Sequence, residues 1–219
     1  TPGGGRSTLT AAMAPHSHHD LSQEASQVAR QKAQQRKLAL SCRDVLPPEV
    51  RRILSRGINY RLLSLPEFVR AHSVLFYVAF RSEVETQAAI ERALAMGKEV
   101  AVPVVQAEPR ALVPCRYTPG DLAPTDLGVM EPRPECAQPV ELSTIDLIIV
   151  PGTAFDAHGG RLGYGLGYYD RLLAEAPPVP RVALAFECQM IPAVAREPHD
   201  LPVDIVLTEE RVLRTLARP

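Results

Sequence analysis

What the sequence lacks narrows the classes of protein to which it can belong. It has no excess of either charge, because 24 Lys and Arg against 25 Asp and Glu give a formal net charge of -1. Nucleic-acid-binding proteins usually carry a basic excess, so we predict no nucleic-acid partner. No apolar run approaches the ~20 residues that a membrane-spanning helix needs, so we predict no membrane partner.

Cysteine is scarce, and its spacing gives no sign of a metal site. The four cysteines, Cys42, Cys115, Cys136 and Cys188, form no Cys-x-x-Cys pair and lack zinc-ligand spacing. Scattered cysteines of this kind indicate reduced thiols in a cytosol-like compartment. Nothing adjacent to Cys188 supports a nucleophilic role for it. We therefore predict a cytoplasmic protein.

The length of 219 residues suits one domain with an N-terminal tail. Residues 1–22 are small and polar, contain glycine and proline, and have no periodic apolar face, so we predict a disordered tail. Acidic residues are absent before Asp20, a feature of transit peptides that makes the mitochondrial matrix an alternative location. Residues 23–219 then form a single α/β domain.

Helical patterns come first in the chain. Residues 23–45 are rich in Gln, Ala, Lys and Arg and predict a helix. Pro47 and Pro48 end that helix and begin a second one, since proline fits the first helical turn. The second helix is predicted to face the core with an apolar stripe formed by Val50, Ile53, Leu54, Ile58 and Leu62.

Strands and helices then alternate. Residues 73–80 and 100–105 are apolar and rich in β-formers, and a helix is predicted between them, from Thr86 as N-cap to Gly97. This order is a βαβ unit, which is typical of a parallel sheet with a right-handed crossover. Residues 106–142 contain many prolines and predict a surface excursion with one short hairpin.

The segment 145–152, IDLIIVPG, is apolar at nearly every position and predicts a strand buried on both faces. The carboxyl end of such a strand is where open α/β sheets bind ligands. Two further strands are predicted at 181–186 and 203–208, followed by a terminal helix from Glu209. The predicted fold class is therefore α/β, with a mostly parallel sheet flanked by helices.

A glycine segment, RLGYGLGYYDR at residues 161–171, lies downstream of that buried strand. Its spacing fits neither a Walker A loop nor the dinucleotide fingerprint. Its bare N–H groups and a helix beginning near Gly167 can nevertheless bind an anion. Arg161 can clamp phosphate oxygens, and Asp170 suits Mg²⁺. The alternative is a glycine-rich surface turn whose tyrosines pack into the core.

Residues 150–173, VPGTAFDAHGGRLGYGLGYYDRLL, resemble the signature of the 5-formyltetrahydrofolate cyclo-ligase family, also called methenyltetrahydrofolate synthetases. Lys32 to Arg36 is similar to the family's Lys-x-x-x-Arg, and residues 81–86 (RSEVET) resemble its Gly-Glu-Val-Asp-Thr segment. Residues 196–209 resemble its closing Glu-x-His-Asp…Asp-x-Ile-x-Thr-Glu. The four segments agree in order and spacing, so the resemblance spans nearly the whole predicted domain.

The resemblance implies an enzyme that converts 5-formyltetrahydrofolate to 5,10-methenyltetrahydrofolate, with ATP as co-substrate and Mg²⁺ as cofactor. ATP phosphorylates the formyl oxygen, N10 closes the ring, and ADP and phosphate are released without a covalent enzyme nucleophile. Phosphoryl transfer of this kind depends on positioning and charge neutralisation. The resemblance also implies a three-layer fold similar to the NagB/RpiA/CoA-transferase-like fold, and a monomer that binds only these small molecules.

The resemblance also assigns site residues. The residues implied to bind ATP are Lys32, Arg36, Arg161, Leu162, Gly163, Tyr164, Gly165, Leu166, Gly167, Tyr168 and Tyr169. Those implied to bind the folate substrate are Val78, Glu83, Glu85, Tyr164, Gly165, Leu166, Gly167 and Tyr168. Asp170 and Asp200 are implied as the metal carboxylates. Leu166 stands where the family commonly has glycine or lysine, and Arg81 and Ser82 stand where it has a small residue.

Other readings remain open from the sequence. The chain could be a non-catalytic protein of the same fold that holds folate or nucleotide, or a different ATP-dependent ligase or kinase. Lys32 and Arg36 are four residues apart on one helical face, which also fits a solvated basic surface. Arg161 and both proposed metal carboxylates favour the enzyme, because binding alone rarely needs all three.

Overall fold

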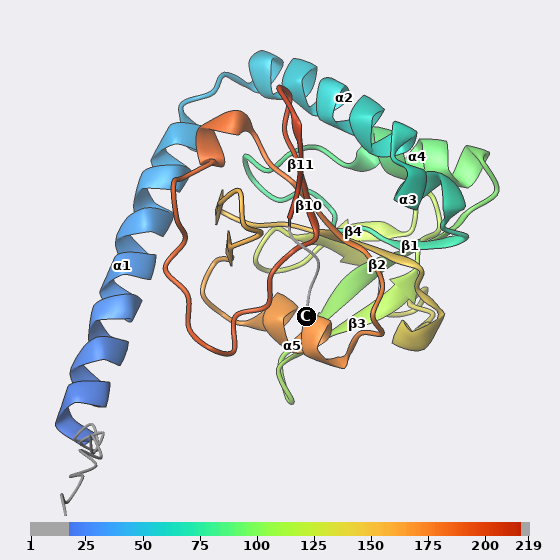
Figure 1. The fold of residues 1–219 in the computed structure, drawn as a ribbon. Helices are drawn as coiled ribbons and strands as arrows, with labels where there is room; N and C mark the ends of the chain where they lie inside the picture. The colour runs from blue at the N-terminus through green and yellow to red at the C-terminus, as the bar shows by residue number, and fades with distance from the viewer. Residues whose placement is uncertain (1–17, 216–219) are drawn as a thin grey trace, which may run out of the picture.

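A seven-stranded sheet forms the centre of the computed structural model, which describes residues 18–215 (Figure 1). The strands lie side by side in the order β11 (Val212–Arg214), β10 (Ile205–Leu207), β9 (Arg181–Leu184), β6 (Leu147–Val150), β1 (Ser73–Leu75), β2 (Glu99–Gln106) and β3 (Ala111–Arg116). The five strands from β10 to β2 are parallel, whereas β11 and β3 pair antiparallel at the two edges. The predicted mostly parallel α/β sheet is therefore confirmed.

Helices cover both faces of this sheet (Figure 1). They are α1 (His18–Asp44), α2 (Pro48–Ser64), α3 (Pro66–Arg70), α4 (Gln87–Ala95) and α5 (Tyr168–Glu175), with 3-10 turns η1 (Leu142–Thr144) and η2 (Glu187–Gln189). Two small hairpins complete the fold: β4 (Leu122–Pro124) with β5 (Met130–Pro132), and β7 (Ala154–Phe155) with β8 (Arg161–Leu162). Over residues 18–215, the helices are too short or too polar to cross a membrane.

The alternation of side chains along β6 explains the three layers. Leu147 and Ile149 point to one face, where they pack in a core cluster with residues of α2, α3 and α4. Ile148 and Val150 point to the other face and pack with Leu172 and Leu173 of α5. All four residues of β6 are fully buried, as predicted for a strand covered on both faces.

The strand predicted over residues 73–80 ends at Leu75. Beyond it the chain turns back on itself, because the Tyr77 hydroxyl donates to the Val84 carbonyl at 2.9 Å and the Thr86 hydroxyl donates to the Tyr77 carbonyl at 2.8 Å. Thr86 therefore precedes α4 as predicted but uses its side chain to close this loop. Gly97 follows α4 with a φ of +77°, as its predicted stop position requires.

The helix predicted from Glu209 is wrong, because the chain forms strand β11 instead. The Thr208 hydroxyl accepts hydrogen bonds from the backbone N–H groups of Glu210 and Arg211, and the Thr208 N–H donates to the Arg211 carbonyl. This tight turn directs the following residues back along β10. Pairing with a neighbouring strand thus decides the structure, which local helix propensity could not reveal.

The excursion at residues 106–142 contains more structure than predicted. Its first part, β3, pairs with β2 and extends the main sheet, and the hairpin of β4 and β5 follows. The first helix also differs from its prediction, since it begins at His18 rather than at residue 23. The rest of the predicted tail, residues 1–17, lies outside the described residues.

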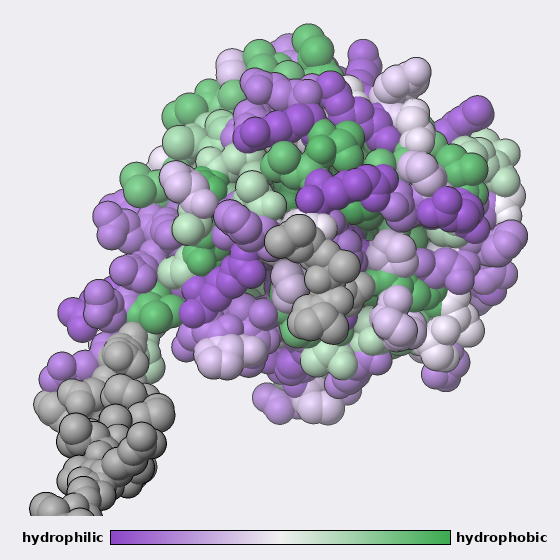
Figure 2. Space-filling view, viewed as in Figure 1, coloured by the Kyte–Doolittle hydropathy of each residue, from purple (hydrophilic) through white to green (hydrophobic). Residues whose placement is uncertain are grey.

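The apolar stripe predicted for α2 is only partly in the core. Ile58 and Leu62 are fully buried and Leu54 packs against them, but Val50 and Ile53 are 37% and 64% exposed. The stripe is buried where α2 packs against α4 and the sheet, and its first turns have no such covering. Figure 2 shows hydrophobic side chains at the surface in the upper part of the molecule, where α2 lies. Tyr60 of the same helix is also exposed, at 74%.

Candidate active site

The glycine segment runs from β8 into α5 and places its glycines where the backbone requires them. Gly165 and Gly167 have φ values of +96° and +68°, in the left-handed region that glycine favours. Leu166 between them is not in this region, and its side chain is 54% exposed. Gly167 immediately precedes α5, as predicted. The N-terminal end of α5 therefore opens directly onto the segment.

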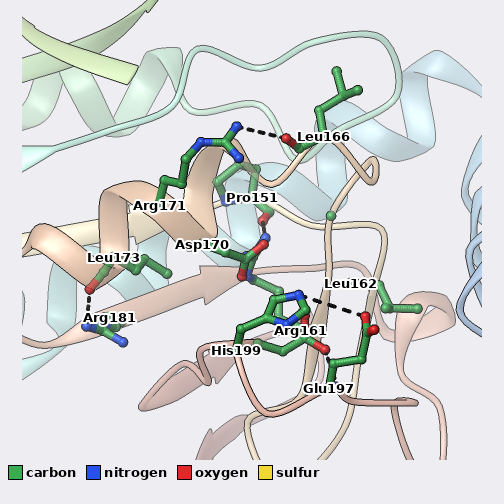
Figure 3. Close-up of polar contacts among 12 residues, drawn as sticks. Pro151, Arg161, Leu162, Leu166, Asp170, Arg171, Leu173, Arg181, Glu197 and His199 are labelled. Atoms are coloured by element: carbon green, nitrogen blue, oxygen red, sulfur yellow. Dashed lines mark hydrogen bonds and ion pairs between the residues drawn. The ribbon is translucent and has the colours of Figure 1, made fainter. Parts of the chain in front are cut away.

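Arg161 and Asp170, predicted as a phosphate clamp and a metal carboxylate, are paired with each other (Figure 3). Arg161 Nη2 donates to Asp170 Oδ1 at 2.6 Å, and the arginine side chain is 2% exposed. Its Nε is buried without a hydrogen-bond partner, and its guanidinium carbon lies 6.0 Å from the Tyr169 ring centroid. Asp170, at 27% side-chain exposure, keeps contact with solvent.

The two cations of α1 reach across to segments far along the chain. Arg36 Nε donates to the Gly163 carbonyl at 2.7 Å. A side chain at Gly165 would begin 3.4 Å from Arg36 Nη2, so this guanidinium lies directly against the glycine segment. Lys32 Nζ lies 2.6 Å from Glu197 Oε2 and 2.5 Å from Asp200 Oδ2. The reading of this face of α1 as a solvated basic surface is therefore wrong for both residues.

The ion pairs of Lys32 also set its charge. Burial lowers the pKa of this amine, but the hydrogen bonds to Asp200 and Glu197 outweigh that effect and raise the pKa above its ordinary value. Lys32 thus stays a cation, and it neutralises the carboxylate predicted as a metal ligand.

The donors available for a metal ion lie in two places. Glu197, His199 and Asp200 offer ligand atoms that all lie within 4.8 Å of one another, whereas Asp170 is not part of this group. Carboxylate oxygens are the ligands that Mg²⁺ takes, usually one or two of them together with substrate phosphates. The oxygens of Asp170 and Asp200 fit that requirement in kind, although each aspartate is paired with a cation of the chain.

The predicted folate residues differ in their accessibility. Glu83 is 7% exposed, and one of its oxygens accepts the Phe80 N–H at 2.9 Å. Burial raises the pKa of its carboxyl to about 7, against the opposing effects of the Phe80 N–H, Arg43 and Tyr164. Glu83 and Tyr164, from segments far apart in sequence, therefore meet.

Glu85, predicted to support Glu83, does not share its buried environment. It is exposed, and its backbone is held by the side chains of Ser55 and Asn59 of α2. Val78 is half-buried against the core.

Leu162 and Tyr168 occupy two different settings. The side chain of Leu162 is buried in a small apolar cluster with Ala39 of α1, which leaves its backbone for any ligand contact. Tyr168 is half-buried, with the guanidinium groups of Arg110 and Arg171 at 6.0 and 5.4 Å from its ring centroid. These cations would sit next to anything that contacts the ring.

Two charged residues of the site, Glu197 and Arg43, were not predicted from the sequence. Glu197 shares Lys32 with Asp200, and its only signal is its place in the closing segment, three residues before Asp200. Arg43 is buried at the end of α1 and donates to the Tyr164 hydroxyl at 2.7 Å. No local pattern marks Arg43, because its partners lie in other segments.

Comparisons with known proteins identify the family of this chain. The 5-formyltetrahydrofolate cyclo-ligase family model matches residues 28–209. The 5-formyltetrahydrofolate cyclo-ligase of Escherichia coli K12 is 32% identical over 174 residues, which cover 78% of this chain and 96% of that protein. The solved 5,10-methenyltetrahydrofolate synthetase of Aquifex aeolicus is 35% identical, with a TM-score of 0.75 over 86% of this chain and 94% of its own. The chain therefore belongs to the 5-formyltetrahydrofolate cyclo-ligase family of enzymes.

Proposed function

We propose that the protein converts 5-formyltetrahydrofolate to 5,10-methenyltetrahydrofolate, in a reaction that requires ATP and Mg²⁺ and releases ADP and phosphate. One observation carries the proposal: family motifs far apart in sequence converge in the fold. Arg36 of the first motif (residues 32–36) holds Gly163 of the glycine segment, and Glu83 of the acidic segment (residues 81–86) meets Tyr164 of the glycine segment. Lys32 of the first motif likewise meets Asp200 of the closing motif.

The phosphates of ATP would lie along the glycine segment, from Arg161 to Tyr169. Its backbone N–H groups and the N-terminal end of α5 favour anions, and Lys32, Arg36 and Arg161 add positive charge. The carboxylates of Asp170 and Asp200 would hold Mg²⁺, which when bound neutralises charge on the β- and γ-phosphates. Binding of ATP would then draw Lys32 and Arg161 toward phosphate oxygens and free the two carboxylates.

The folate substrate would lie between the acidic segment and the glycine segment. Glu83 as a carboxylate accepts N–H donors of the pterin, and the rings of Tyr164 and Tyr168 would pack against the substrate. Val78 contributes apolar surface, and Glu85 stands at the exposed rim. A buried acceptor of this kind discriminates strongly, because a ligand without matching donors would leave it unpaired.

The chemistry then needs positioning and charge more than a reactive side chain. The formyl oxygen attacks the γ-phosphorus and ADP leaves. N10 attacks the activated carbon, the new C–N bond closes the ring, and N10 releases its proton to the phosphate group or to water. The C–O bond then breaks with loss of phosphate. Lys32, Arg36 and Arg161 would surround the phosphoryl group. The residues that bind the folate would hold N10 near the formyl carbon. We further propose a cytoplasmic monomer, and the free thiols of all four cysteines support a reducing compartment.

The test measures ADP release and methenyl-folate absorbance in the same reaction. We expect the two products in equal amounts, and only when ATP, Mg²⁺ and 5-formyltetrahydrofolate are all present. ADP release that ignores the folate would indicate a different ligase or kinase. Binding of both ligands without ADP release at any Mg²⁺ concentration would indicate a non-catalytic binding protein.

A further inference from the structure

A buried arginine outside every motif joins the segments of the site. Arg43 lies in the last turn of α1 and is 1% exposed. Its Nε donates to the Ser82 hydroxyl at 2.9 Å and its Nη2 to the Tyr164 hydroxyl at 2.7 Å. Its Nη1 reaches the Gly152 carbonyl at 3.4 Å. One guanidinium thus connects α1, the acidic segment, the end of β6 and the glycine segment.

The partners of Arg43 are a hydroxyl, a phenol and a carbonyl, all of them neutral. Burying a guanidinium on neutral partners costs free energy that a contacting carboxylate or an apolar side chain would spare. Two carboxylates balance its charge from further away. Asp44 accepts a short hydrogen bond from the Ser82 hydroxyl, and Glu83 interacts with Arg43 electrostatically. The Arg43 charge is therefore directed at the Glu83 side of the site without being neutralised by a direct ion pair.

Glu83 is surrounded by groups from four elements. Arg43 faces it from α1, Tyr77 from the loop after β1, Tyr164 from the glycine segment and Tyr169 from α5. The cation of this set is Arg43, and it opposes the effect of burial on the Glu83 carboxyl. The three phenols are neutral at physiological pH, since burial raises the pKa of each.

We propose that Arg43 is a positioning residue for the folate substrate: it fixes Tyr164 against the acidic segment and supplies the positive charge that faces the Glu83 carboxylate. The proposal rests on the function proposed above, in which ionised Glu83 receives the pterin. It assigns Arg43 to recognition of the folate and not to recognition of ATP, because its contacts lie on the Ser82 and Tyr164 side of the segment.

The test is calorimetric binding of 5-formyltetrahydrofolate without ATP, from about pH 6 to pH 9, for the parent, Arg43→Met and Arg43→Lys. In the parent, the carboxyl pKa of about 7 predicts that affinity falls as the pH drops through 7. Arg43→Met removes the cation, so the midpoint should move upward by about one pH unit. Affinity near neutral pH should drop and should recover at higher pH, which a merely distorted site would not do.

Arg43→Lys keeps a positive charge but cannot hold Ser82 and Tyr164 together. We expect it to leave the midpoint near that of the parent and to weaken folate binding severalfold, with an unchanged KM for ATP. Arg51→Met is the matched control: it removes an α2 arginine that donates to the Leu46 carbonyl outside the site. This control should titrate like the parent, and it also reports any titration of the ligand itself.

The outcomes separate the two proposals. A parent protein that neither binds nor converts 5-formyltetrahydrofolate overturns the proposed function. An active parent whose Arg43→Met variant keeps the same midpoint overturns the role of Arg43, even if affinity falls equally at every pH. Should Arg43→Met fail to fold, Arg43→Lys decides: a raised folate KM with an unchanged ATP KM supports the proposal, and two unchanged values overturn it.

Discussion

The Asp170 carboxylate contacts one cation of its own chain and is proposed to contact Mg²⁺ as well. As a proposed metal ligand, Asp170 should lose metal affinity when it is replaced by asparagine. The substitution should also lower stability, because it leaves Arg161 buried without its counter-charge. We expect turnover to fall by at least about a hundredfold, or ~2.7 kcal/mol, and the free energy of unfolding to fall by about 1–3 kcal/mol.

Two measurements check this prediction: methenyl-folate formation across a Mg²⁺ titration, and urea unfolding. High Mg²⁺ should restore part of the activity and none of the stability. Asp126→Asn, which changes an exposed aspartate, is the control and should alter neither quantity. If Asp170→Asn keeps parental turnover at every Mg²⁺ concentration, the metal role belongs to Asp200 or to another group.

Neighbouring residues of the glycine segment should differ sharply in tolerance. Leu166 is exposed and has no left-handed backbone, so Leu166→Gly should change kcat/KM for ATP by less than about twofold. Gly165→Ala adds a Cβ in the left-handed region, at ~1–2 kcal/mol, and pushes it toward Arg36. We expect a clearly raised ATP KM for Gly165→Ala in steady-state kinetics. The reverse order of sensitivity would mean that Leu166 packs against a substrate.

Among the secondary-structure elements, the β7–β8 hairpin depends on one buried carboxylate. Asp156 accepts the N–H groups of His158, Gly160 and Val194 at 2.8 Å each, and Arg196 at 2.9 Å. Burial alone would raise its pKa, but these donors hold it below its ordinary value. The cluster fixes the strand that carries Arg161 beside the segment that leads to Glu197. Asp156 therefore ties together two segments that are proposed to bind ATP and Mg²⁺.

We expect Asp156→Asn to lower the free energy of unfolding near neutral pH by about 2–4 kcal/mol. The sign of the pH dependence follows from the lowered pKa: the stabilisation is present above the unfolded-state pKa of about 4 and is lost as the pH falls through the folded-state pKa. Urea unfolding at a series of acidic pH values should therefore show a steeper loss for the parent than for the variant. Parallel curves would mean that another group carries the acid transition.

The elements that could be predicted are those with a complete local signal. A few neighbouring residues are enough to predict the buried strand β6, the start of α5 after Gly167 and the end of α4 before Gly97. Strand β11 could not be predicted, because Val212–Arg214 becomes a strand only by pairing with β10. The outward exposure of Val50 and Ile53 depends in the same way on which surface covers α2.

The residues of the site also divide into those that the sequence could predict and those that needed the tertiary structure. Motif resemblance pointed to Lys32, Arg36, Glu83, Asp200 and the glycine segment. The fold pairs Lys32 with Asp200, and it brings Arg36 and Glu83 to the glycine segment. Arg43 and Glu197 needed the tertiary structure, since each acts on a residue more than a hundred positions away. A buried cation at the end of a polar helix also looks, in sequence, like any solvated arginine.

At the scale of the whole molecule, the described side chains of α1 attach this helix to the domain mainly by polar contacts. Within the part of α1 whose side chains are described, Ala39 and Arg43 are the buried residues, and the N-terminal half of the helix extends past the rest of the domain (Figure 1). Elements with few buried apolar contacts open most readily. We expect amide hydrogen exchange in α1 to be faster than in β6, and Lys32→Ala to accelerate it further in α1 alone. Equal protection of α1 and β6 would contradict this.

The large sequence separation between α1 and its contacts also determines when the proposed site can form during synthesis of the chain. Lys32 and Glu197 are 165 positions apart, and Arg36 and Gly163 are 127 apart. The ribosome therefore releases Lys32 and Arg36 long before their partners Glu197 and Gly163. Until then α1 lacks both of these contacts, however well the central strands have paired. A nascent chain that already holds β1, β2, β3 and β6 still lacks Gly163 and Glu197, so the proposed nucleotide site is completed only after much of the sheet has been made.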